Sequence, residues 1–339
     1  MSLHTPGFAI PRTVLGRTGL EVSKLSLGTW GFGNASAPEA RIGDDDNLIA
    51  VLRAAFAAGV TILDSAEAYD NEERLGRLLK RVDNVPDNLV IGTKFGHGKG
   101  FTADQFKASV ERSLKELELK KIELMMIHDP RNEEDMKTVL GKGGAVEALR
   151  KLQDEGLVGS IGVATGTLTP LKLAVECGEF DAIQFPRLYT LLNPAAAASG
   201  LLDAAKEKNI GTLLAAPFAG NILATGVRGV KKPLYGYWPA LPEVIEAVGK
   251  MQDRAQALGL TIAQAALAYP VTSPLVHSTV VGITRPSELQ QNLDAFGVSI
   301  SREDLESIAE AGQIDEYFLG GPEFAWPFPE DRKEEFLGS

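Results

Sequence analysis

The sequence predicts an α/β fold, a closed (β/α)8 or TIM barrel, and three observations lead to this prediction. Short apolar segments alternate with amphipathic segments eight times along the chain. Right-handed crossovers join parallel strands in such an alternation, and eight units can close into a barrel. The 339 residues suit one barrel, which needs roughly 250 residues plus insertions. No G-x-G-x-x-G or P-loop motif occurs, which argues against the competing doubly wound sheet.

The eight expected strands are short, and several are rich in Val, Ile and Leu. Strands that are buried on both faces of a parallel sheet have this composition. These segments should therefore form the barrel wall. In chain order they are 25–29, 60–65, 89–94, 124–129, 159–164, 181–185, 211–216 and 278–283.

Helical spacing is found between the expected strands. In 102–117 the apolar residues recur every three or four positions and form one apolar stripe, with Thr102 and Gln105 placed for a capping box. Proline suits the first turn of a helix, because the missing amide hydrogen costs nothing there. Further helical patterns, three of them beginning near Pro170, Pro194 and Pro286, cover 71–80, 145–155, 171–177, 195–208 and 288–296.

Three segments lie outside the alternation. Residues 12–24 have glycines at a turn and predict an N-terminal β-hairpin that could close the bottom of the barrel. Residues 219–241 predict a long loop after the seventh strand, and loops of this length are usually functional or disordered. Residues 317–339 form an aromatic tail that we expect to pack on the barrel. With no linker in between, the chain from 1 to 339 is predicted to be one domain.

Composition and charge argue against several classes of partner and ligand. A net charge of −11 argues against nucleic acid or an anionic membrane surface as partner. No apolar run approaches the roughly 18 residues of a membrane span, and the N-terminus lacks a signal-peptide pattern, so cytoplasmic is the default expectation. Four dispersed histidines and one cysteine give no metal spacing, so no metal site is expected. The oligomeric state is left open.

Polar side chains end three successive expected strands. Asp64 ends the second strand, and Tyr69 follows five residues later. Lys94 ends the third strand and His128 the fourth. Because the active sites of such barrels lie at the carboxyl ends of the strands, these groups should meet at one opening. Each one alone has an ordinary structural explanation, and His97, just past Lys94, is expected in a solvated loop.

Together the four groups suit proton transfer to or from an oxygen atom. A phenol has a pKa near ~10, and a nearby ammonium such as that of Lys94 lowers it. Asp64 can keep Lys94 charged and oriented, while His128 can hydrogen-bond a substrate oxygen. With Tyr69 as the general acid or base, such a set can protonate a carbonyl oxygen or deprotonate an alcohol while hydride moves at the carbon.

The segments that carry these residues resemble the aldo-keto reductase superfamily, and the resemblance extends over nearly the whole chain. The family's N-terminal hairpin and first strand correspond to GRTGLEVSKLSLGTW. Its Asp–Tyr segment and the following helix start correspond to ILDSAEAYDNEERLGRLLK, its lysine to VIGTK and its histidine to MMIHD. The resemblance therefore implies a catalytic tetrad formed by Asp64, Tyr69, Lys94 and His128.

The resemblance also implies that NADP or NAD binds across the opening, with the nicotinamide near Tyr69. Gln184 would bond the carboxamide, beside Asp64 and Thr165. A helix that begins near residue 286 could hold a phosphate through backbone amides, although an ordinary capped helix is the alternative. The other implied cofactor-binding residues are Gly28, Thr29 and Trp30 at the nicotinamide, Ala216, Pro217, Phe218, Gly220 and Ile222 under the pyrophosphate, and Gly282, Thr284, Arg285, Gln291 and Asn292 at the adenosine.

Three positions depart from the family pattern. Thr165, with Ala164 before it, replaces a common Ser-Asn pair, and Ala215 stands where a tyrosine often stacks on the nicotinamide. Glu288 aligns with the arginine that commonly grips the 2′-phosphate of NADP. A carboxylate repels phosphate but can accept from ribose hydroxyls, while Arg285 could take the phosphate instead. The choice between NADP and NAD is therefore left open.

The stretches AAPFAG and HDPR resemble a sugar-oxidising branch of the family, which includes D-threo-aldose 1-dehydrogenases and L-galactose dehydrogenases. Trp30, Tyr237 and Trp238 would then stack on a sugar, with Tyr69 and His128 at the reacting carbon. The same aromatic residues could line an apolar aldehyde pocket or simply anchor the loop.

We thus expect an NAD(P)-dependent aldo-keto reductase or aldose dehydrogenase that acts on a small carbonyl or sugar substrate. One alternative is a nicotinamide-binding regulatory subunit with little turnover. Another is a class I aldolase in which Lys94 forms a Schiff base.

Overall fold

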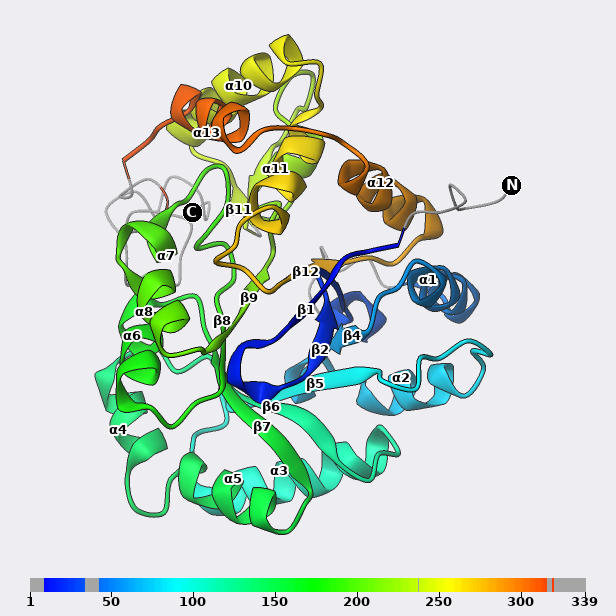
Figure 1. The fold of residues 1–339 in the computed structure, drawn as a ribbon, viewed down its shortest axis with the longest axis vertical. Coiled ribbons are helices and arrows are strands. Elements are labelled where there is room, and N and C mark those ends of the chain that lie inside the picture. Colours follow the sequence, from blue (N-terminus) through cyan, green and yellow to red (C-terminus); the bar gives the residue numbers. More distant parts are fainter. Residues whose placement is uncertain (1–8, 34–42, 237, 316–318, 320–339) are drawn as a thin grey trace, which may run out of the picture.

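The protein is a closed eight-stranded parallel barrel surrounded by helices, as the computed structural model in Figure 1 shows. The structure describes residues 9–33, 43–236, 238–315 and 319. Around the barrel the strand order is β12-β3-β4-β5-β6-β7-β8-β9, so each strand pairs with its neighbours in sequence and the last pairs with the first. The predicted (β/α)8 architecture is confirmed, and the doubly wound alternative is excluded.

All eight predicted strands are present, and their side chains are almost entirely buried, as expected for strands covered on both faces. In Figure 1 the strands β4, β5 and β6 are coloured from blue to turquoise. The bounds are β3 Leu25–Gly28, β4 Ile62–Asp64, β5 Val90–Phe95, β6 Ile122–His128, β7 Val158–Ala164, β8 Ala182–Gln184, β9 Gly211–Ala215 and β12 Ser278–Gly282.

The parallel register aligns the carboxyl ends of neighbouring strands at one end of the barrel. Asp64 is paired with Gly28 on one side and with Gly92 on the other. His128 is paired with Ala164, which in turn is paired with Gln184. The polar residues that end the strands therefore lie around one opening.

Helices cover the outside of the barrel. In α3, the capping box between Thr102 and Gln105 is present as predicted. The predicted helix over 195–208 is two helices, because Gly200 has a left-handed φ of +76° and interrupts it. The helices are α1 Asp45–Ala57, α2 Glu72–Leu79, α3 Ala103–Glu116, α4 Glu133–Leu140, α5 Ala145–Asp154, α6 Leu168–Cys177, α7 Ala195–Ala198, α8 Leu201–Glu207, α9 Ile222–Thr225, α10 Pro242–Ala257, α11 Ile262–Val271, α12 Pro286–Phe296 and α13 Arg302–Ala311.

The N-terminal hairpin closes one end of the barrel. Its strands β1 Arg12–Val14 and β2 Glu21–Ser23 are antiparallel, and they lie across the barrel in Figure 1. Leu15 and Val22 are fully buried and pack with side chains of the barrel interior. Gly16 permits this close approach, because a Cβ there would lie 2.4 Å from the amide nitrogen at the start of β9. The predicted hairpin is therefore confirmed.

The described residues of the segment 219–241, after β9, include regular secondary structure. It contains α9 and a small antiparallel pair, β10 Leu234–Tyr235 and β11 Trp238–Pro239. A bridge between Gly220 and Tyr235 folds it back on itself. Tyr237 and the aromatic tail lie outside the described residues, apart from Leu319, whose buried carbonyl accepts from Tyr235 Oη at 3.3 Å. Across the described ranges, no helix combines the length and apolarity that a membrane crossing requires.

Candidate active site

Asp64, Tyr69 and Lys94 meet at the carboxyl ends of β4 and β5. Lys94 Nζ donates to Asp64 Oδ2 at 2.8 Å, to the carbonyl of Ser65 at 2.7 Å and to Tyr69 Oη at 3.3 Å. The lysine side chain is 2% exposed, so this ion pair lies almost entirely out of water. The three predicted residues are thus brought into direct contact.

Lys94 remains charged in this environment. Burial by itself disfavours the ammonium, but the opposing attraction of Asp64 and Tyr69, with their hydrogen bonds, outweighs it and raises the pKa of Lys94. A Schiff base requires a neutral, accessible amine, so this geometry argues against the aldolase alternative.

A hydrogen-bonded loop holds Tyr69 in place. Asn71 donates to the carbonyl of Thr29 at 2.6 Å and accepts from the Ser65 hydroxyl at 2.7 Å. Gly33 lies so close that a Cβ on it would be 1.9 Å from the carbonyl oxygen of Tyr69. The ends of β3 and β4 are therefore tied to the short turn that contains the tyrosine.

Glu72, at the start of α2, stabilises the same region through buried hydrogen bonds. No role was predicted for it from the sequence. It is 1% exposed, and its carboxylate accepts from the hydroxyls of Thr93 on β5 and Ser113 on α3. Burial raises the pKa of Glu72. Thr93 directly precedes Lys94, so these bonds fix the strand end that carries the lysine. The Asn-Glu pair in the sequence could have signalled both residues, but it was interpreted only as a helix start.

His128 completes the predicted tetrad from the end of β6. Its ring centroid lies 6.0 Å from that of Tyr69 in an edge-to-face arrangement. Burial, the positive charge of Lys94 and the charge of His97 lower the pKa of His128 to about 3, against a smaller opposing effect of Asp129. Its Nδ1 is buried without a hydrogen-bond partner among the described residues. The imidazole is therefore neutral near pH 7 and able to bond a neutral oxygen.

The low pKa of His128 predicts a pH-dependent contribution to stability. The unfolded chain, with a histidine pKa near 6.5, binds the proton more readily than the folded chain. The free energy of unfolding therefore decreases as the pH falls from about 6.5 towards 3. At pH 4.5 the loss should be about 2–3 kcal/mol. We expect the His128→Gln variant to lose less unfolding free energy between pH 7 and 4.5 than the wild type, measured by urea denaturation. Equal losses in both proteins would contradict a neutral His128.

His97 lies in an exposed turn, as expected, and its ring also lies beside the site. Its ring centroid lies 5.4 Å from that of His128, and its Nδ1 is 3.0 Å from Asp129 Oδ2. Asp129 has a left-handed φ of +62° and also accepts from Arg131 at 3.0 Å and from the Thr165 hydroxyl at 3.3 Å. Asp129 thus connects the loops after β5, β6 and β7. Its place directly after the strand-ending histidine was the available signal.

The residues expected near the nicotinamide line the opening, but three of them have polar groups that already bond protein partners. Gln184 Nε2 donates to Asp64 Oδ1 at 2.8 Å, so one amide hydrogen is engaged in the tetrad. The Thr165 hydroxyl contacts Asp129, as described above. Thr29 bonds the carbonyl of Asp64 through its amide at 2.9 Å and its hydroxyl at 3.0 Å. Trp30 is half-buried at the same strand end.

Small side chains leave the opening accessible. Gly282 at the end of β12 is exposed, and a Cβ on it would have no atom within 4 Å. Ala216 and Gly220 are exposed after β9, and Ala215 is half-buried. Ala216 has a left-handed φ of +53°. Pro217 is buried, Phe218 half-buried and Ile222 fully buried beneath this exposed backbone. This open, small-residue surface with polar groups at its edge fits an extended dinucleotide.

At the expected adenosine end, Glu288 caps its own helix. Its Oε2 accepts from the amide of Thr284 at 2.9 Å and from that of Arg285 at 3.2 Å. The amides of Thr284 and Arg285 are therefore already bonded at the α12 N-terminus, and Pro286 has no amide hydrogen to donate. Arg285 and Gln291 are exposed, whereas Asn292 is buried. The carboxylate lies where a phosphate would otherwise meet the backbone.

Removal of this carboxylate should favour NADPH. We expect Glu288→Ala to lower the Kd for NADPH relative to that for NADH by about tenfold, because about 1.4 kcal/mol of repulsion and competition is lost. Loss of the cap should also cost about 1 kcal/mol of unfolding free energy. Fluorescence titration with both nucleotides and urea denaturation measure the two effects. An unchanged ratio of the two Kd values would mean that Glu288 does not discriminate between them.

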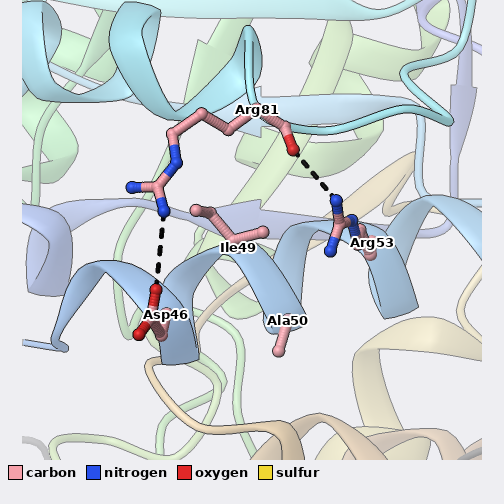
Figure 2. Close-up of a pocket in the computed structure, with 5 residues that line it drawn as sticks. All are labelled: Asp46, Ile49, Ala50, Arg53 and Arg81. Atoms are coloured by element: carbon pink, nitrogen blue, oxygen red, sulfur yellow. Dashed lines mark hydrogen bonds and ion pairs between the residues drawn. The ribbon is translucent and has the colours of Figure 1, made fainter.

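A shallow pocket of about 270 Å³ lies away from the strand ends, on α1 and the segment after α2. Figure 2 shows the five residues that line it. Among them, Arg81 donates to the Asp46 carboxylate at 3.5 Å, and Arg53 donates to the Arg81 carbonyl at 3.1 Å. These are exposed polar contacts between neighbouring helices. Among the described residues no group of three His, Cys, Asp or Glu side chains could hold a metal ion.

Comparison with known proteins identifies the class to which this barrel and tetrad belong. Residues 24–313 match the aldo/keto reductase family. The chain is 29% identical to D-threo-aldose 1-dehydrogenase of Pseudomonas sp., over 87% of this chain and 96% of the relative. It is 27% identical to L-galactose dehydrogenase of Arabidopsis thaliana, over 83% and 86% respectively. A solved aldo-keto reductase structure from Pseudomonas aeruginosa matches with a TM-score of 0.62 and 25% identity, over 85% of this chain and 96% of that one.

The protein is thus a barrel oxidoreductase that uses NADP or NAD. More narrowly, the chain belongs to the aldo-keto reductase family. The predicted resemblance, including similarity to aldose and galactose dehydrogenases, is confirmed.

Proposed function

We propose that this enzyme transfers hydride between the nicotinamide and the carbonyl or hydroxyl carbon of an aldehyde, ketone or aldose, with Tyr69 as general acid and base. The observation that supports this most directly is the buried ammonium of Lys94, 2.8 Å from Asp64 and 3.3 Å from the Tyr69 hydroxyl. The nicotinamide supplies or accepts the hydride when it is bound. All other steps fall to the side chains around the opening.

In this proposal Tyr69 moves the proton. The charged Lys94 lies beside the phenol oxygen and stabilises the phenolate that remains when the proton passes to a carbonyl oxygen. Asp64 keeps the ammonium in place through its own hydrogen bond and is itself held by Gln184. The neutral His128 bonds the same substrate oxygen and aligns it with the phenol.

We infer further that the substrate is a small polyhydroxylated aldehyde of the aldose class. The relatives named above support this, because both are named as sugar dehydrogenases. The half-buried Trp30 and Trp238 provide flat apolar surfaces of the kind that stack on a sugar ring. His97, next to His128 and bonded to Asp129, adds a polar partner for a sugar hydroxyl.

Cofactor binding and turnover test the proposal. We would titrate the protein with NADPH and NADH by tryptophan fluorescence, then measure oxidation of L-galactose and reduction of 4-nitrobenzaldehyde with the tighter cofactor. Saturable binding with turnover of both supports the proposal, and a lactone product supports the aldose assignment. Tight binding without turnover of either would favour the regulatory subunit, and absence of binding would overturn the proposal.

A further inference from the structure

Arg187 lies at the barrel opening, three residues after Gln184, and has no role in the reaction described above. Its amide donates to the carbonyl of Ala215 at 2.9 Å, so its backbone lies beside the end of β9. Its φ of +63° is left-handed, a conformation that non-glycine residues rarely adopt and that is often retained at functional sites. The fold thus holds this arginine in an unfavourable backbone conformation at the edge of the site.

The guanidinium of Arg187 lies between two loops that border the opening. Nη1 is 2.7 Å from the position that a Cβ would occupy on Gly236, and Nη2 is 3.9 Å from that of Gly166. Gly236 donates to the carbonyl of Ala219 at 2.9 Å. The guanidinium therefore borders the segment 216–222, for which we expect contact with the cofactor pyrophosphate. It occupies space that a side chain at position 236 would fill.

Arg187 is half-buried, yet no acceptor among the described residues bonds its guanidinium. Two other partly buried arginines, elsewhere in the chain, pair with carboxylates. Arg74 lies 2.7 Å from a carboxylate oxygen of Asp45, and Arg302 lies 3.0 Å from one of Glu306. A guanidinium offers five donors in a planar fork, and leaving them without a strong acceptor at a partly dry position costs free energy. Such a group suits an incoming anion.

We propose that Arg187 binds a phosphoryl group at the barrel opening, and this inference rests on the oxidoreductase function proposed above. The phosphoryl group comes from the pyrophosphate of the nucleotide or from a phosphorylated substrate. Phosphoryl oxygens match the arginine fork and accept two parallel hydrogen bonds. Three features favour this chemistry: the cation has no bonded acceptor among the described residues, Gly236 makes room beside it, and the 216–222 segment is its neighbour.

The test compares Arg187→Met with the wild type. The matched control is Arg254→Met, because Arg254 also lacks a carboxylate partner among the described residues but bonds Ser307 between α10 and α13. Tryptophan fluorescence would give the Kd for NADPH, NADH and inorganic pyrophosphate. If the group is the nucleotide's pyrophosphate, all three should bind at least tenfold more weakly to Arg187→Met and within twofold of the wild type to Arg254→Met. Arg187→Lys should show an intermediate loss.

A second measurement distinguishes the other source. Calorimetry would compare binding of glycerol 3-phosphate and glycerol to the NADP⁺ complex. If the substrate provides the phosphoryl group, the preference for glycerol 3-phosphate should fall at least tenfold in Arg187→Met while nucleotide affinity is unchanged.

Changes below twofold in every one of these affinities would overturn the inference. If Arg187→Met does not fold, Arg187→Lys decides the matter, because wild-type affinities in that variant would exclude a bidentate role. None of these measurements requires turnover. An inactive wild-type protein would therefore overturn the proposed reaction without affecting the result for Arg187.

Discussion

A Tyr69→Phe variant is expected to lose about 10³-fold in kcat while its Kd for the tighter-binding nucleotide changes by less than twofold. Positioned proton transfer contributes about 10²–10⁴-fold to such reactions. The substitution removes one oxygen atom and leaves the ring against His128. Lys94 keeps its bonds to Asp64 and Ser65, so the remainder of the site should be undisturbed. Steady-state kinetics and fluorescence titration measure the two quantities.

Tyr189→Phe provides the matched control for this prediction. It also removes a phenol oxygen that takes part in hydrogen bonds, here with Ser273 at 3.1 Å and Arg302 at 2.9 Å. These partners lie after α11 and at the start of α13, so the variant should keep wild-type kcat. If Tyr69→Phe retained more than a tenth of wild-type kcat, the tyrosine would not be the proton donor.

The barrel could be predicted because its determinants are local. Each strand is a short buried apolar run. Several helices show an apolar stripe, and some also show a cap, as Thr102 and Gln105 do for α3. The tetrad followed from the same pattern, since a polar residue that ends a parallel barrel strand must lie at the common opening. The hairpin was visible because Gly16 and Gly19 mark a turn, and both have positive φ.

Features that depend on contacts between distant segments could not be predicted. The His97 ring contacts Asp129, whose backbone is left-handed, and no local sequence pattern indicates this contact or this φ. Gln184 was expected to face the nicotinamide. Its hydrogen bond to Asp64 depends on how β8 and β4 face each other across the barrel. No acceptor among the residues that the structure describes bonds the guanidinium of Arg187, and a sequence cannot reveal such a feature.

A Lys94→Met variant is expected to lose both activity and stability. Its kcat should fall about 10³-fold, because the phenolate of Tyr69 loses the adjacent positive charge. The folded state should also lose about 3–5 kcal/mol, because Asp64 is left buried without its counter-ion. The side chains of Lys94 and Asp64 are 2% and 9% exposed, so water cannot replace the lost bond. Steady-state kinetics and urea denaturation at pH 7 measure the two losses.

The double variant Asp64→Asn, Lys94→Met separates the two effects. Without either charge, the buried site no longer contains an unpaired ion, and we expect the double variant to be more stable than Lys94→Met alone. Activity should stay as low as in the single variant, because the ammonium beside Tyr69 is still missing. Recovered stability without recovered activity would mean that Asp64 positions Lys94 and that Lys94 acts on Tyr69. A double variant less stable than Lys94→Met would instead mean that the hydrogen bonds of Asp64, including the one from Gln184, contribute more than its unpaired charge costs.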